Sequence, residues 1–134
     1  MRSFKSVALF FAIVLSMGMT EAFDPEAVVQ RQLDAYNARD LERFVREYTE
    51  DVVVYRMPDP TPVIVGRDAL AAYYRENRFN LPGLHATLVK RMVVGNKVID
   101  QEHIVGVGDA PIDAAVVFEV TDRGIAKVWM FRGE

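Results

Sequence analysis

The sequence VGNKVIDQEHIVG at residues 94–106 has the most unusual residue pattern in the chain. Its last ten residues are rich in Val and Ile and follow a Gly-Asn pair, which predicts a β-strand entered from a hairpin turn. Side chains alternate between the two faces of a strand, so Asp100 and Glu102 share one face while Gln101 and His103 share the other. Whichever face is buried, it would place polar groups among aliphatic ones, and burying polar groups in a purely apolar core is energetically unfavourable. The pattern therefore predicts one wall of a pocket.

Residues 84–94 are the expected partner strand. A two-residue loop places Arg91 opposite Asp100 as a cross-strand ion pair, and it places Glu102 opposite Val89. The arginine should hold Asp100 ionised, whereas desolvation beside an apolar neighbour should raise the pKa of Glu102. Glu102 is therefore the favoured proton-transfer group.

A second hairpin is predicted from residues 114–121 and 125–132, joined by a three-residue loop that places Glu119 opposite Lys127 as another cross-strand ion pair. One face of this hairpin is almost uniformly apolar, and we expect it to pack against helices. Helices cannot cover both faces of a sheet, so apolar residues on the other face require a partner. We expect a homodimer through this outer patch, which consists of Val117, Trp129 and Phe131.

Helices are predicted before these hairpins. Asp24 as N-cap, followed by proline, starts a helix over residues 24–36. Asp40 is the N-cap of a second helix, which apolar spacing predicts over 41–48, and the same spacing predicts a third over 68–78. Short strands are expected between the second and third helices. This order predicts an α+β domain with its helices on one side of a curved sheet.

The N-terminus has the pattern of a secretory signal peptide over residues 1–22: a basic start, an apolar run over 7–19 and small residues ending at Ala22. The run is shorter than the roughly 20 residues that span a bilayer, although an uncleaved anchor is the alternative. Cleavage would leave residues 23–134 as a single secreted or periplasmic domain, with no membrane attachment.

Composition narrows the function classes. The chain has a net charge of −3, which becomes −4 without the expected signal peptide, so nucleic acid is not an expected partner. It contains no cysteine, and His85 and His103 are expected on opposite strand faces, so we predict no metal site. No glycine-rich phosphate loop is present, and no cofactor is expected.

The chain resembles the nuclear transport factor 2-like superfamily, most closely its SnoaL-like and ketosteroid-isomerase-like branch. The resemblance covers nearly all of the mature chain and is carried by VVQRQLDAYNARDLERFVREYTEDVVVY at 28–55, PVIVGRDALAAYY at 62–74, VGNKVIDQEHIVG at 94–106 and FEVTDRGIAKVWMFR at 118–132. It implies a cone-shaped, curved antiparallel sheet with three N-terminal helices on its concave face, enclosing an apolar pocket.

The catalytic groups of the ketosteroid isomerases do not carry over. The resemblance aligns Gln32 with their oxyanion-donating tyrosine and Arg56 with their aspartate base. Ala114 or Ala115 takes the place of their protonated aspartate. Ketosteroid isomerisation is therefore not expected.

Two functions remain open. The first is cofactor-free acid–base chemistry of the isomerase, cyclase, dehydratase or hydrolase type on a small, mostly apolar molecule, with Glu102, Asp100 and Arg56 as catalytic candidates. Arg56 would orient the substrate or polarise an oxygen. The second is a non-catalytic ligand-binding or dimerisation domain. The remaining expected pocket residues are Gln32, Tyr48, Tyr74, Arg91 and Ile104. If the strand faces are reversed, His103 and Gln101 become the pocket pair.

Overall fold

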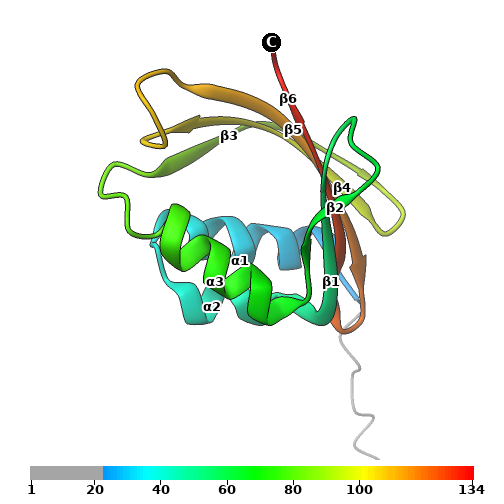
Figure 1. Cartoon of the computed structure of the whole chain (residues 1–134). Helices are drawn as coiled ribbons and strands as arrows, with labels where there is room; N and C mark the ends of the chain where they lie inside the picture. The colour runs from blue at the N-terminus through cyan, green and yellow to red at the C-terminus, as the bar shows by residue number, and fades with distance from the viewer. Residues whose placement is uncertain (1–22) are drawn as a thin grey trace, which may run out of the picture.

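A computed structural model describes residues 23–134, so the expected signal peptide lies outside the described residues. These residues form three helices and a six-stranded sheet with the strand order β2-β1-β6-β5-β4-β3 (Figure 1). Neighbouring strands are antiparallel, except for β1 and β6, which are parallel. The elements are α1 (Pro25–Asn37), α2 (Leu41–Arg46), β1 (Tyr48–Arg56), β2 (Pro62–Val65), α3 (Arg67–Asn77), β3 (His85–Val94), β4 (Lys97–Val105), β5 (Ile112–Thr121) and β6 (Gly124–Arg132).

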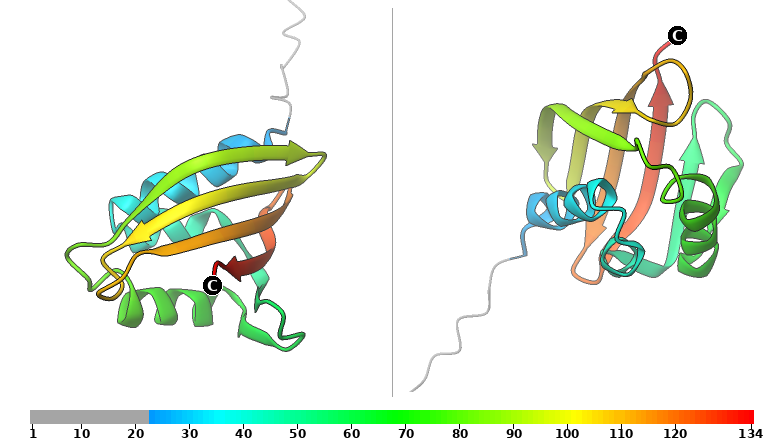
Figure 2. Two further views of the ribbon diagram at one scale, coloured as in Figure 1. Left: turned by 90° about the horizontal axis from the view of Figure 1, so that it is seen from above. Right: turned by 90° about the vertical axis from the view of Figure 1, so that its left-hand side faces the viewer.

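The sheet curves around the helices, which all lie on its concave side (Figures 1 and 2). Helix α1 packs against β3 to β6, whereas α3 packs against β1 and β2. The predicted α+β fold, with its cone-shaped sheet, is confirmed. No helix in residues 23–134 is long and apolar enough to cross a bilayer.

The two N-caps predicted for α1 and α2 are present. The Asp24 carboxylate accepts a hydrogen bond from the backbone N–H of Ala27 at 3.2 Å, and the Asp40 carboxylate accepts one from Arg43 at 3.1 Å. Helix α2 is nevertheless shorter than its apolar spacing predicted, because Tyr48 begins β1.

Pairing with β6 explains the early end of α2. The Glu47 carbonyl accepts a hydrogen bond from the backbone N–H of Ile125 at 2.8 Å, so strand pairing replaces the next helical turn. Tyr48 remains buried, but it reaches the interior from a strand.

The predicted β3–β4 register, including the pair of Arg91 with Asp100, is confirmed from the turn as far as Lys90 and Gln101, and it shifts by one residue beyond that point. A bulge between Leu88 and Lys90 leaves Val89 without a partner, so Leu88 lies opposite Glu102. The predicted Val89–Glu102 pair is therefore wrong. Val89 is 56% exposed, because the extra residue rotates it to the outer face.

The β5–β6 register agrees with the prediction as far as the Glu119–Lys127 pair and then shifts by one residue. Thr121 consequently pairs with Gly124, and the loop has two residues instead of three. The Glu119 carboxylate forms its ion pair with Lys97 of β4, at 3.2 Å, and not with Lys127 as expected.

The two faces of the β5–β6 hairpin are oriented as predicted. The inward side chains of Val116, Phe118 and Val128 are buried. On the outer patch, Phe131 is 44% exposed, and the Trp129 ring stacks on that of Tyr55 with centroids 6.1 Å apart. The outer patch thus has no helix above it.

Candidate functional site

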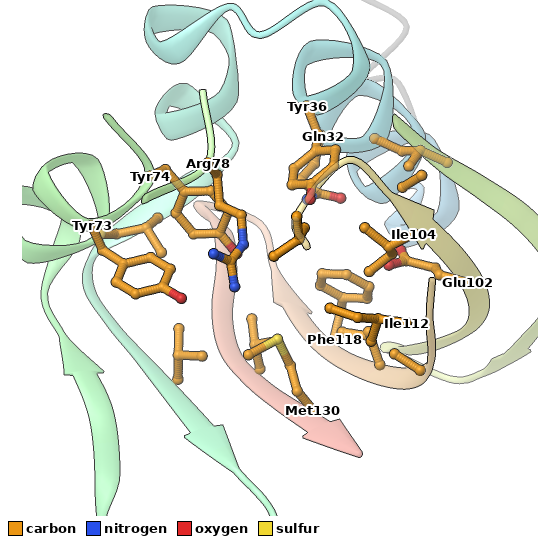
Figure 3. Close-up of a pocket in the computed structure, with 18 of the residues that line it drawn as sticks. Gln32, Tyr36, Tyr73, Tyr74, Arg78, Glu102, Ile104, Ile112, Phe118 and Met130 are labelled. Atoms are coloured by element: carbon orange, nitrogen blue, oxygen red, sulfur yellow. The ribbon is translucent and has the colours of Figure 1, made fainter. Parts of the chain in front are cut away.

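A cavity of about 80 Å³ lies between α1, α3 and the concave face of the sheet (Figure 3). This volume is several times the ~10–15 Å³ that one water molecule requires. Most of the lining is aliphatic or aromatic. The lining residues with polar groups are Gln32, Tyr36, Tyr48, Tyr73, Tyr74, Arg78, Glu102 and Arg132.

Glu102 is the only carboxylic acid among the lining residues of this cavity, and its side chain comes from β4. The residue is 8% exposed, and its carboxyl group makes no hydrogen bond or ion pair within residues 23–134. Burial, together with the negative charge of nearby Asp100 and partly offset by Arg91, raises the pKa of Glu102 to about 7. Glu102 can therefore both donate and accept a proton near neutral pH.

Asp100 and Arg91 form a buried ion pair beside the cavity. Asp100 is fully buried, and Arg91 binds both of its carboxylate oxygens, with an Nε–Oδ1 distance of 2.7 Å and an Nη2–Oδ2 distance of 2.8 Å. Arg91 also donates to Gln30 Oε1 at 2.9 Å. Neither member of the pair lines the cavity, so their prediction as pocket residues was wrong. The bidentate contact engages both Asp100 oxygens, which leaves this carboxylate a structural role.

Gln32 and Tyr48 line the cavity, as expected, and both are buried. The Gln32 Oε1 atom is buried without a hydrogen-bond partner in the described chain. Burial raises the pKa of the Tyr48 hydroxyl well above its usual value, whereas a hydrogen bond with the Gln32 side chain partly lowers it. A buried acceptor without a donor is unfavourable, which points to an external donor.

The hydroxyls of Tyr36 and Tyr74 remain protonated at neutral pH. Burial raises the pKa of Tyr36 to about 12, and burial likewise raises the pKa of Tyr74. Arg78 lowers both pKa values and Glu102 raises them, so the cation and the carboxyl group act on the same two phenols. The cavity therefore offers neutral phenol groups as hydrogen-bond donors.

Arg56 does not lie in the cavity. Val54 is the last β1 residue in the lining, and Arg56, one pleat further along, is exposed beyond the cavity edge. Its predicted role in substrate orientation therefore has no geometric basis. Arg78 and Arg132 are the arginines that line the cavity. Ile104 lies in the lining, as predicted.

Sequence reasoning missed the two lining arginines for different reasons. Arg78 follows the last residue of α3, and the direction of a helix-end side chain depends on how the chain leaves the helix. Alternation does place Arg132, like Met130, on the inward face of β6, but it does not show that the end of this strand reaches the cavity.

The alternative pocket pair lies on the outer face. Gln101 is exposed, and His103 Nδ1 lies 2.7 Å from Asp113 Oδ1 on the neighbouring strand. Within residues 23–134, no group of three His, Cys, Asp or Glu side chains is placed to hold a metal ion.

The Glu102→Gln substitution should change how stability depends on pH. The native pKa of about 7 lies above the ordinary value of 4.5, so the native state binds more protons between these values and wild-type stability falls as pH rises. The full effect, about 3 kcal/mol, is reached above pH ~7 and is absent below pH ~4.5. Urea unfolding from pH 4 to 8 should show that the free energy of unfolding of the variant rises relative to that of wild type across this window. A constant difference would contradict the raised pKa.

The curved sheet, the three helices on its concave face and the enclosed cavity define a nuclear transport factor 2-like α+β domain. Residues 29–128 match the model of the SnoaL-like domain, and the chain belongs to this family. A search of curated proteins found no match.

Solved structures share the fold at low sequence identity. A candidate ketosteroid isomerase from Kribbella flavida is 22% identical with a TM-score of 0.71, over 82% of this chain and 78% of that one. A SnoaL-like protein of unknown function from Burkholderia thailandensis is 20% identical, with a TM-score of 0.69 and coverages of 82% and 94%. A candidate polyketide cyclase from Sinorhizobium meliloti is 18% identical, with a TM-score of 0.67 and coverages of 81% and 99%.

Proposed function

We propose that the cavity binds a small, mostly apolar molecule and that Glu102 exchanges a proton with it without a cofactor. The observation that carries this proposal is a carboxyl group that faces an apolar cavity, lacks a partner in the described chain and has a pKa of about 7. A carboxyl group that served only the fold would be expected to have a charged or hydrogen-bonding partner, as Asp100 has in Arg91.

The surrounding phenols suit the same chemistry. Ionised Glu102 would accept a proton from a carbon or oxygen atom of the ligand, which leaves negative charge on the ligand. Tyr36 and Tyr74 remain protonated and could donate hydrogen bonds to this charge. Isomerisation, cyclisation and dehydration all contain such a step. The ketosteroid isomerase and polyketide cyclase names of the structural neighbours agree with this class.

The proton-transfer step can be tested with 5-nitrobenzisoxazole. A base removes the proton from its ring C–H, the electrons of that bond form the nitrile, and the N–O bond breaks to release a coloured phenolate. We expect saturable turnover above the buffer rate that increases with pH around a midpoint near 7, the pKa of Glu102. If the protein binds the probe but does not accelerate the reaction, proton transfer is rejected in favour of a non-catalytic ligand-binding domain.

Export remains part of the proposal, on the basis of the basic and apolar N-terminal pattern. We expect the mature protein to begin at Phe23 and to be secreted or periplasmic. N-terminal sequencing of protein from its native host tests this, and a chain that retains Met1 in a membrane fraction would instead indicate an anchor.

We also propose a homodimer through the outer patch. Phe131 is 44% exposed, and no helix covers this side of the sheet (Figure 2). Trp129→Glu should then give a monomer in sedimentation, because it places a charge within the patch, whereas Lys127→Glu on the neighbouring exposed position should remain dimeric. A monomeric wild type would contradict the dimer.

A further inference from the structure

We propose that the ligand of the cavity is a small hydroxycarboxylate, with its carboxylate at Arg78 and Arg132, its hydroxyl at Gln32 and an apolar body between them. This inference rests on the proposed function, because it takes the cavity to be the ligand site. It goes further in specifying the charge of the ligand and the groups at its two ends.

The first observation is the state of Arg78. Its guanidinium extends into the cavity from the end of α3 (Figure 3) and lies 5.4 Å from the centre of the Tyr73 ring. It donates to the carbonyl of adjacent Asn77 at 2.7 Å. Within residues 23–134 it forms no ion pair, unlike Arg91 with Asp100. A planar, half-buried guanidinium without a counterion favours binding of a carboxylate.

The second observation is the balance of charge around the cavity. Arg132 contributes another guanidinium at the C-terminal end of β6, so two cations and one carboxylic acid line the space. The carboxyl group of Glu102 lies across the cavity from Arg78 in Figure 3, and it is only partly ionised near neutral pH. The lining, with Arg78 half-buried and Arg132 exposed, therefore carries an excess of positive charge that an anionic ligand would balance.

The third observation is Gln32 Oε1, which is buried and lacks a donor in the described chain. Gln32 is 6% exposed and lines the cavity from α1. An acceptor requires an O–H or N–H group, and a ligand hydroxyl would supply one. The lining also contains the apolar side chains of Ile104, Ile112 and Met130 (Figure 3). These features together fit an aliphatic chain with a carboxylate at one end and a hydroxyl at the other.

The test compares the binding of three matched series of probe molecules, each with five to eight carbons. Binding is measured by NMR of the ¹⁵N-labelled protein. The series are ω-hydroxyalkanoates, α,ω-diols without the charge, and alkanoates without the hydroxyl. For the best-fitting length, the hydroxyalkanoate should bind about tenfold or more tightly than the diol, because a charge-assisted hydrogen bond is lost in the diol. It should also bind more tightly than the alkanoate.

The variants assign each preference to its residue. Arg78→Met should abolish the preference for hydroxyalkanoate over diol, Arg78→Lys should retain part of it, and Gln32→Met should abolish the preference over alkanoate. Arg75→Met, an exposed arginine on the same helix, is the control and should change neither. Equal binding of diol and hydroxyalkanoate, no binding of any series, or a preference for hydroxyalkanoate over diol that survives Arg78→Met would overturn the inference.

The outcomes also separate this inference from the proposed function. If hydroxyalkanoates bind with the expected preference but 5-nitrobenzisoxazole is not turned over, proton transfer is rejected and the anion site stands. If turnover depends on Glu102 but the diols bind equally well, the anion site is rejected and proton transfer stands.

Discussion

Glu102→Gln should lower the turnover of 5-nitrobenzisoxazole by about 10²- to 10⁴-fold, the usual contribution of a positioned general base. Glutamine has nearly the same shape as glutamate but cannot accept the ring proton. Glu102 is also the only carboxylic acid among the cavity-lining residues, so no carboxylate there can replace it. The loss should appear in kcat, with the dissociation constant of the probe almost unchanged.

The control is Glu119→Gln, the same substitution on the neighbouring strand. Glu119 pairs with Lys97 at 3.2 Å and does not line the cavity, so its loss should leave the rate unchanged. An equal decrease in both variants would indicate a general loss of structure. A Glu102→Gln variant that retains the wild-type rate would show that another group removes the proton.

Arg91→Met should lower the free energy of unfolding by about 3–5 kcal/mol at neutral pH, the typical cost of leaving one member of a buried ion pair without its partner. Asp100 is fully buried, and both of its carboxylate oxygens bind Arg91. Methionine fills much of the arginine volume but removes both contacts. The Gln30 side chain would also lose its hydrogen bond from Arg91.

A second substitution distinguishes the buried charge from lost packing. The double variant Arg91→Met with Asp100→Asn should recover a large part of the stability, because it removes the charge that has lost its partner. Arg46→Met removes an arginine from the exposed pair with Glu42 and should cost less than ~0.5 kcal/mol. Urea unfolding at pH 7 measures the stability of all three variants. An Arg91→Met variant that is no less stable than Arg46→Met would contradict this account of the pair.

The inner face of the sheet was predictable because alternation and turn chemistry both pointed to it. Asp100 and Glu102 lie on the face that packs towards the helices, and Arg91 lies opposite Asp100, as the Gly-Asn loop required. The helix starts at Asp24 and Asp40 followed from capping residues. These are local features that neighbouring residues determine almost alone.

The missed features depend on contacts between distant segments. The bulge at Val89 changes the neighbours of Glu102, and no residue in β3 marks it. Pairing with Ile125 draws Tyr48 into β1 although its spacing suits a helix. Arg56 has the inward strand alternation, yet it extends past the end of the cavity. Sequence spacing identifies the face of a residue, but the depth of the cavity depends on the whole assembly.

The central claim is that Glu102 is a proton-exchanging group in an apolar cavity, and ¹³C NMR titration of its side-chain carboxyl carbon tests it most directly. Wild-type protein labelled at glutamate, with Glu102→Gln used to assign the signal, should show a midpoint near pH 7. The reference for comparison is the ordinary glutamate pKa of 4.5. A Glu102 midpoint below pH ~5 would show that the carboxyl group is solvated or has a partner, and it would contradict the account.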